Sequence, residues 1–258
     1  MAKTIVLSNQ KGGVGKTTSA YVLALLLQER GARVLAVDLD PQGNLSFCLG
    51  SEKEGIATIY DVLKGELKAR YAVQKSTLVD LLAANILLSG IELEFTGARR
   101  EFLLSKQLET LKPYYDYIII DSPPALGILT VNAFTAADYV LVPMLSDIFS
   151  LQGITQLDET IRQVRAHCNP RLEVLGVFLT QHSRKNAFSL EVEGTLEMVA
   201  SDFQMPVLPS IRKSMALREA EALQQSVLEY APTCFTVQDY DSLVDELFLG
   251  RLRPDDKK

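Results

Sequence analysis

The sequence predicts a single α/β domain of the doubly wound type, in which a mostly parallel, twisted sheet carries helices on both faces. Two observations lead to this prediction. Strand-like aliphatic runs alternate with helical patterns along the chain, which is typical of right-handed crossovers between parallel strands. The runs are also nearly continuously apolar, as expected of strands covered on both faces. No Pro/Ser-rich linker, low-complexity segment or internal repeat interrupts the 258 residues, so we expect one domain over 1–258.

Each element has its own local signal. A first strand over 4–8 is followed by a helix over 16–30, and Gly31 is well placed to end that helix. Buried strands are expected at 33–38, 117–121, 139–143 and 172–180, with a weaker strand at 78–82 and a short one at 206–208. Further helices are expected at 58–64, 97–111, 151–167, 187–202, 214–225 and 236–249.

The composition excludes several classes of protein. Cys48, Cys168 and Cys234 are widely spaced and indicate reduced thiols rather than a disulfide framework or a metal site. The first strand begins at once, which argues against a signal peptide, and the apolar runs are far shorter than the roughly 20 residues that span a bilayer. A formal net charge of −6 argues against a globally cationic nucleic-acid binder but leaves room for a local basic patch. We therefore expect a cytoplasmic protein.

A glycine-rich loop lies between the first strand and the first helix. Such a loop, closed by Lys-Thr, cradles nucleotide phosphates because its backbone N–H groups converge on the anion and the helix N-terminus adds a favourable dipole. Lys16 is expected to reach the β- and γ-phosphates, and the Thr17 hydroxyl to ligate Mg²⁺. The predicted nucleotide-binding residues are Lys11, Gly12, Gly13, Val14, Gly15, Lys16, Thr17 and Thr18.

The start of this loop departs from the general motif. The motif has Gly where this chain has Gln10, and Lys11 adds a second lysine to the loop. One interpretation is that Lys11 is an ordinary solvated lysine. The other is that it points away from its own nucleotide and reaches that of a second subunit, as an arginine finger does in trans, with an effect on rate of roughly 10³–10⁵. In that case Lys11 is catalytic together with Lys16, and ATP drives dimerisation by bridging two subunits.

Acidic residues follow two of the predicted strands. Asp38 and Asp40 come at the end of 33–38, and Asp121 ends 117–121. Ligands of parallel α/β sheets bind at the carboxyl ends of the strands, so these acids should lie near the phosphate loop. Asp121 is the expected Walker B acid that holds Mg²⁺, Asp40 is the candidate to position or activate the attacking water, and Asp38 should support Asp40 and shape the Mg²⁺ shell. Each acid alone could be a helix cap, but the joint arrangement predicts nucleotide binding and hydrolysis. The predicted metal-site residues are Thr17, Asp38 and Asp121.

Together, these motifs resemble the ParA/MinD group of deviant-Walker ATPases. The resemblance rests on Lys-Gly-Gly-x-Gly-Lys-Thr-Thr at 11–18, on Asp-Leu-Asp-Pro-Gln-Gly-Asn at 38–44, and on Asp-Ser-Pro-Pro-Ala-Leu-Gly at 121–127. It runs over about residues 3–248. Within the group, the chain is most similar to the short, Soj-like ParA ATPases of chromosome and plasmid partition.

The resemblance implies both an activity and a set of partners. It implies ATP and Mg²⁺ as cofactors, an ATP-dependent homodimer, and binding to nonspecific double-stranded DNA. It also implies slow ATP hydrolysis that a ParB-type centromere-binding protein stimulates, and a nucleoid-associated location. Because the phosphate loop begins at residue 11, we expect no N-terminal helix-turn-helix domain.

Basic residues in the carboxyl-terminal third are the candidates for DNA contact in such a protein. They would contact phosphates without reading the base sequence; the alternative is that they are ordinary solvated charges. The chain has Ile-Arg-Lys-Ser at 211–214 where the family often has Ile-Pro-Arg-Asn, and Ala216 replaces a common basic residue. The candidates are Arg184, Lys185, Arg212, Lys213 and Arg218.

Two alternatives to DNA segregation stay open. One is a MinD-like, membrane-associated spatial regulator, and the other is a ParA-like ATPase that positions a protein cargo on the nucleoid. The segment 247–253 mixes apolar and basic residues, as an amphipathic membrane anchor does. Gly250 and Pro254 interrupt it, however, and 255–256 are acidic, so no stable membrane association is expected.

Overall fold

The named strands of the described sheet all run parallel to one another. The computed structural model describes residues 1–51, 55–183 and 187–250. Within them, a six-stranded sheet has the order β3-β2-β4-β1-β5-β6, and each neighbouring pair of strands runs parallel. The strands are β1 (Lys3–Leu7), β2 (Val34–Asp38), β3 (Asp80–Leu82), β4 (Tyr117–Asp121), β5 (Tyr139–Leu145) and β6 (Glu173–Thr180).

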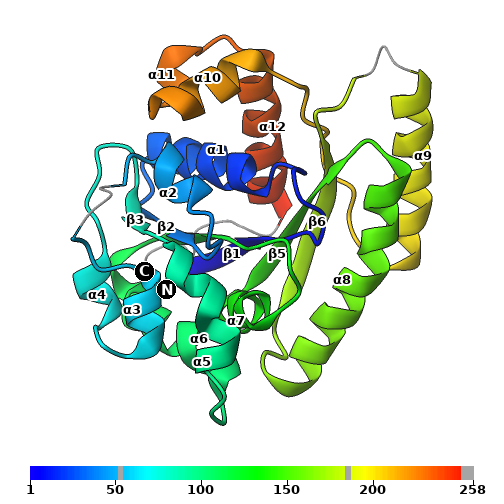
Figure 1. Cartoon of the computed structure of the whole chain (residues 1–258). Coiled ribbons are helices and arrows are strands. Elements are labelled where there is room, and N and C mark those ends of the chain that lie inside the picture. The colour runs from blue at the N-terminus through cyan, green and yellow to red at the C-terminus, as the bar shows by residue number, and fades with distance from the viewer. Residues whose placement is uncertain (52–54, 184–186, 251–258) are drawn as a thin grey trace.

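Helices cover both faces of the sheet (Figure 1). On one face lie α1 (Lys16–Glu29), α2 (Asn44–Cys48), α10 (Met215–Leu223), α11 (Val227–Tyr230) and α12 (Phe235–Gly250). On the other lie α3 (Ile59–Lys64), α4 (Ala69–Ala72), α5 (Ile91–Glu94), α6 (Leu103–Leu108), α7 (Ile128–Ala136) and α8 (Ile148–His167), with α9 (Ala187–Asp202) beside α8. The predicted doubly wound α/β architecture is confirmed.

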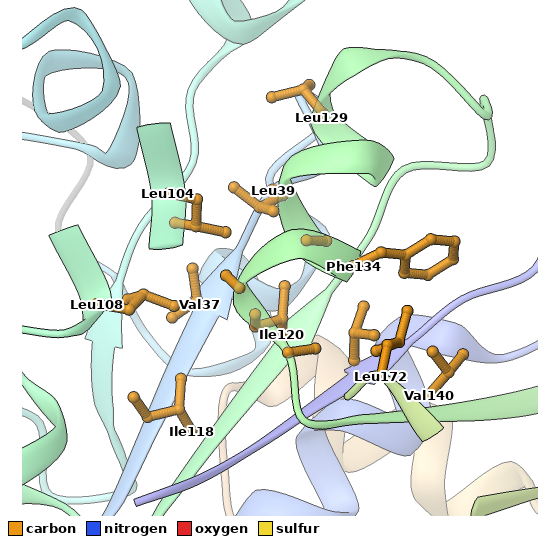
Figure 2. Packing of buried hydrophobic residues seen from close by; sticks show 14 of the residues in the cluster. Val37, Leu39, Leu104, Leu108, Ile118, Ile120, Leu129, Phe134, Val140 and Leu172 are labelled. Carbon is orange, nitrogen blue, oxygen red and sulfur yellow. The ribbon is translucent and has the colours of Figure 1, made fainter. Parts of the chain in front are cut away.

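A separate apolar core fills each of the two layers. Because side chains alternate along a strand, Ile119 of β4 packs in the core beneath α1, whereas Ile118 and Ile120 pack in the opposite core. Figure 2 shows Ile118 and Ile120 in the same cluster as Leu104 and Leu108 of α6. Burial on both faces explains why the strands are continuously aliphatic rather than alternating in polarity.

One predicted strand is wrong. The segment 206–208 makes only a single parallel bridge, between Val177 and Val207. Pro206 accepts a hydrogen bond from the backbone N–H of Val177 through its carbonyl, at 2.8 Å, but it has no N–H of its own to extend a ladder. The apolar run at this position is therefore an edge contact of β6.

One predicted helix needs correction, and one longer helix was not predicted. The expected helix over 97–111 is broken, because Arg99 has a φ of 67° and only the short helices η2 (Arg100–Phe102) and α6 follow it. Helix α7 was not predicted, since it is buried on nearly every side and has no polar face that would give a helical period. The remaining short helices that were not predicted are α2, α4, α5 and α11, with the 3₁₀ turns η1 (Ile86–Gly90) and η3 (Lys112–Tyr114).

The strand register brings the predicted site residues to one edge of the sheet. Leu7, at the end of β1, pairs with Asp121 at the end of β4. Asp38, at the end of β2, pairs with Asp121 from the other side. The phosphate loop that follows β1 therefore begins directly beside the strand-end acids, at the carboxyl edge where ligands of such sheets bind.

Candidate functional site

The loop between β1 and α1 turns at glycines. Gly13 and Gly15 have φ values of 73° and 86°, a left-handed conformation that glycine adopts without strain. Gly15 is also the N-cap of α1. Thr180, at the end of β6, donates its hydroxyl to the Val14 carbonyl at 2.7 Å and fixes the loop from the other side. The loop and the N-terminus of α1 thus have the geometry of an anion cradle.

The Lys16 side chain is buried at the bottom of this loop. Its ammonium donates to the Lys11 carbonyl at 3.3 Å. Burial lowers the pKa of Lys16, while the negative charges of Asp121 and Asp40 act in the opposite direction. Both acids are therefore close enough for their charges to act on the ammonium, so this lysine joins the phosphate loop to the strand-end carboxylates.

Asp121 is fully buried at the end of β4. It accepts a hydrogen bond from the Thr17 hydroxyl on Oδ2 at 2.6 Å. Burial, followed by the nearby charge of Asp38, raises the pKa of Asp121 well above its ordinary value. Its second oxygen, Oδ1, has no hydrogen-bond partner within the described ranges. A buried carboxylate oxygen of this kind normally has a partner, which here fits a bound cation or its water.

These residues fit a magnesium ion. A hydroxyl and a carboxylate are hard oxygen donors of the type that Mg²⁺ prefers, and Mg²⁺ usually takes its remaining ligands from phosphates and water. Across the part of the chain that the structure describes, no group of three or more His, Cys, Asp or Glu residues forms a metal cage. Thr17 and Asp121 would hold the ion, and the ion would neutralise phosphate charge.

Asp38 and Asp40 differ in what their carboxylates contact. Asp38 is fully buried and accepts from the backbone N–H of Asp40 at 3.0 Å and from the N–H and hydroxyl of Ser46 at 2.8 and 2.7 Å. Burial raises the pKa of Asp38 to about 6, against the effect of these hydrogen bonds. Asp40 is only half-buried, lines the adjoining cavity, and accepts from the Gln42 N–H at 3.0 Å. Asp38 therefore holds the turn that presents Asp40 to the cavity.

Lys11 is held by an acid of its own chain. Its ammonium lies 2.7 and 2.6 Å from the two carboxylate oxygens of Asp147, which follows β5. Its backbone N–H donates to Asn9 Oδ1 at 3.0 Å, and Asn9 in turn donates to the Pro143 carbonyl at 2.8 Å. Lys11 is therefore ion-paired and about a third exposed, and both interpretations, a solvated loop lysine and a contact in trans, stay predictions. Sequence reasoning missed both Asn9 and Asp147. For Asp147 a signal was available, because it is an acid just after a predicted strand.

A cavity of about 510 Å³ opens beside the loop. The phosphate loop forms one part of its wall, and Phe47, Cys48, Glu221 and Tyr240, from α2, α10 and α12, form another. This size suits a ligand of the nucleotide class. Sequence reasoning identified the phosphate end of this cavity but none of these four residues.

The described basic candidates for DNA contact also border this cavity. Arg212, Lys213 and Arg218 are exposed and lie on its wall. The Arg212 guanidinium is paired with Asp239 at 2.7 Å, which together with its hydrogen bonds raises the pKa of Arg212. Arg218 donates to Gln181 Oε1 at 3.4 Å. The other two candidates, Arg184 and Lys185, lie outside the described residues.

Relatives of known name match nearly the full chain. The family model of the AAA domain matches residues 2–174. The chain is 41% identical over 251 residues to the chromosome partitioning protein ParA of Caulobacter vibrioides, which covers 95% of this chain and 93% of that protein. It is 38% identical over 252 residues to the sporulation initiation inhibitor protein Soj of Bacillus subtilis, which covers 96% of this chain and 98% of Soj.

Solved structures agree with these relatives. A cobyrinic acid a,c-diamide synthase from Mycobacterium smegmatis with bound ADP and magnesium is 34% identical, with a TM-score of 0.82 over 98% of each chain. A McdA variant from Cyanothece in complex with ATP is 26% identical, with a TM-score of 0.86 over 95% of this chain and 96% of that one. None of the described helices is long and apolar enough to cross a bilayer. The chain therefore belongs to the ParA/Soj-like family of partition ATPases, and it is an ATPase with ATP and Mg²⁺ as its cofactors.

Proposed function

We propose that this protein is a DNA-segregation ATPase that dimerises on ATP, binds double-stranded DNA without sequence preference, and hydrolyses ATP slowly until a ParB-type centromere-binding partner stimulates it. It would act in the cytoplasm, in association with the nucleoid. The names of a 41% identical relative, the chromosome partitioning protein ParA, and of a 37% identical relative, the chromosome-partitioning ATPase Soj of Treponema pallidum, support the partition role. The placement of Lys11 supports the dimer.

The observation that carries the proposal is the separation of the two loop lysines. Lys16 is buried among the strand-end acids, whereas about a third of the Lys11 side chain is exposed, with its ammonium on Asp147. A cation at this place is accessible to a phosphate of a second molecule. In a symmetric dimer each subunit would then contribute one lysine to the other's ATP.

The dimer is tested by molar mass in solution with no nucleotide, with Mg²⁺-ADP and with Mg²⁺-ATP. We compare the unmodified protein with Lys11→Ala and with Lys106→Ala, which removes the same charge from an exposed position on α6. The unmodified protein and Lys106→Ala should dimerise with ATP. Lys11→Ala should bind ADP normally but fail to dimerise or to turn over. Normal dimerisation together with normal turnover in Lys11→Ala would refute the role in trans.

DNA binding is tested on a duplex of arbitrary sequence. Binding should require ATP and weaken with salt, because released counterions drive contacts between basic side chains and phosphates. The triple alanine variant of Arg212, Lys213 and Arg218 should bind less DNA and show a smaller salt slope than a matched control variant. The control has alanine at Lys64 of α3, at Lys68, the N-cap of α4, and at Arg70 of α4. The affinity of the Arg212, Lys213 and Arg218 variant for Mg²⁺-ADP is measured as well, because these three residues border the nucleotide cavity. Absence of ATP-dependent DNA binding at low salt would refute this part of the proposal.

Two further assays separate the proposal from its alternatives. A ParB-type protein should raise ATP turnover in the presence of DNA; stimulation by a protein cargo adaptor alone would indicate cargo positioning. Sedimentation with anionic lipid vesicles should bring down no protein, and ATP-dependent sedimentation would favour a MinD-like role.

A further inference from the structure

Glu221 has an unusual position in the wall of the nucleotide cavity. It lies on α10, and it borders the cavity together with Thr18 of α1 and Cys48 of α2. The phosphates belong at the glycine loop, so the wall that α2, α10 and α12 form is left for the nucleoside. The carboxyl group of Glu221 is thus placed on the part of the cavity that faces the sugar or the base.

One oxygen of this carboxyl group lacks a hydrogen-bond partner in the protein. The Thr18 side chain is close enough to Glu221 to lower the pKa of its carboxyl group. Oε1 is buried and has no hydrogen-bond partner anywhere in the described part of the chain. Burial raises the pKa of Glu221, while the Thr18 side chain and the charge of Arg218 oppose that rise. A buried acceptor without a partner is destabilising, and native proteins keep few of them.

Neighbouring hydroxyl groups do not supply the missing partner. Tyr240, whose pKa is sensitive to the charge of Glu221, shares a hydrogen bond of 2.8 Å with Ser19. Tyr21, which also senses that charge, donates to the Gln225 carbonyl and accepts from the Val227 N–H at 3.1 Å. Both tyrosines are therefore engaged in joining α1 to the C-terminal helices. Neither tyrosine hydroxyl therefore donates to Glu221 Oε1, which is left as a buried acceptor on the cavity wall.

We propose that Glu221 is a nucleoside-recognition residue, whose free carboxylate oxygen accepts a hydrogen bond from an O–H or N–H group of the bound nucleotide. The donor is either a ribose hydroxyl or the 6-amino group of adenine. Guanine presents a carbonyl oxygen at the position of that amino group, so a Glu221 that faced it would also select against guanine. The proposal rests on the ATP-binding role of the cavity and adds a contact beyond the phosphate loop.

Calorimetric titration with Mg²⁺-ADP tests this contact without hydrolysis or dimerisation. Glu221→Ala should weaken ADP binding by about tenfold to a hundredfold, the size expected for a hydrogen bond to a charged acceptor. Glu221→Gln keeps the shape and one carbonyl acceptor and should fall in between. Glu219→Gln, on an exposed acid of the same helix that pairs with the Tyr230 hydroxyl, removes the same charge and should bind ADP normally.

Nucleotide analogues identify the donor and separate recognition from a structural role. The analogues are 2′-deoxy-ADP, 3′-deoxy-ADP and purine riboside 5′-diphosphate, which lacks the 6-amino group. The analogue that lacks the true donor should bind the unmodified protein at least about tenfold more weakly than ADP, and should lose little further affinity in Glu221→Ala. A merely structural Glu221 would lower the affinity for ADP and for all three analogues by the same factor.

Several outcomes would overturn the proposal. Equal ADP binding by Glu221→Ala would show that the carboxylate contributes nothing to recognition, and tighter binding would show that it repels the nucleotide. Equal binding of ADP and all three analogues to the unmodified protein would also overturn the proposal, and that result does not depend on any variant folding. If, in contrast, Lys16→Ala bound Mg²⁺-ADP as well as the unmodified protein, the assignment of the whole cavity would fail and not that of Glu221 alone.

Discussion

Replacing Asp147 with Asn should strengthen ATP-dependent dimerisation. Both carboxylate oxygens of Asp147 lie within 2.7 Å of the Lys11 ammonium. In the proposed dimer, each Lys11 has to exchange this carboxylate for a phosphate of the partner's ATP. Asp147→Asn removes the competing charge and keeps a side chain of nearly the same shape, so the exchange should cost less.

The expected size of the effect follows from the exposure of the pair. The two side chains are 32% and 29% exposed, so water screens their attraction and the value for a buried pair does not apply. A charge-assisted hydrogen bond at such a site contributes about 1–2 kcal/mol. A symmetric dimer breaks two of these pairs, one in each subunit, so dimerisation should gain about 2–4 kcal/mol. This corresponds to a dimer Kd that is lower by about 30-fold to 1000-fold.

Sedimentation velocity over a range of protein concentrations, at saturating Mg²⁺ and a slowly hydrolysed ATP analogue, measures this constant. Glu159→Gln makes the same charge change at an exposed position on α8 and should leave the dimer unchanged. The gain should shrink as salt is added, since the pair is partly exposed. ADP affinity is measured in parallel to separate dimerisation from a general effect on nucleotide binding. A dimer that is no tighter than that of the unmodified protein would refute the competition between Asp147 and phosphate.

Four further substitutions test the site and its support. Lys16→Ala should abolish Mg²⁺-ADP binding in calorimetry, and an unchanged affinity would contradict the role of the loop. Asp40→Asn should still dimerise with ATP but turn over about 10²–10⁴-fold more slowly, and normal turnover would exclude Asp40 as the water-positioning group. The folded-state pKa of Asp38 is raised to about 6, above its unfolded value of 3.8. In metal-free protein, the contribution of Asp38 to the free energy of unfolding should therefore fall by about 3 kcal/mol as the pH rises from about 4 to 6. Between pH 4.5 and 7.5, urea denaturation samples about 2 kcal/mol of this loss, which Asp38→Asn should remove. An equal pH dependence in both proteins would contradict the prediction. Gly176→Ala would place a Cβ 2.6 Å from the Pro206 carbonyl oxygen. Urea denaturation should therefore show a loss of about 1–3 kcal/mol in the free energy of unfolding. An unchanged free energy of unfolding would mean that the segment at Pro206 shifts without cost.

Local patterns were enough to predict the sheet. The strands are short aliphatic runs that are buried on both faces, and such runs can be recognised in the sequence without knowing which elements pack against them. Helix α7 and the segment 206–208 show where such reasoning stops. The first is buried on nearly every side and lacks a helical period, and the second is apolar but meets β6 through one bridge only. In both cases the packing partner decides the structure.

The candidate site also has a part that the sequence predicts and a part that only the packing of distant segments reveals. The loop at 11–18 and the strand-end acids could be predicted because motif spacing and the carboxyl-edge rule act on single strands. Asp147 lies 136 residues from Lys11, and the two meet only because β5 pairs with β1. Glu221 reaches the cavity because α10 packs near α1 and α2, which no local pattern indicates.

The contacts of Lys11 with Asn9 and Asp147 suggest how a monomer would avoid hydrolysing ATP before it dimerises. Asn9 holds its backbone N–H and Asp147 holds its ammonium, so the residue is fixed at both ends. Giving up the carboxylate costs about 1–2 kcal/mol per subunit, and a monomer forms no new contacts that offset this cost. The proposed dimer would, because subunit contacts and a phosphate partner would form at the same time. Asp147 would therefore act as a threshold in that proposal. It would keep the second lysine away from any ATP until two nucleotide-loaded subunits meet, so that catalysis by Lys11 and dimerisation would become one event.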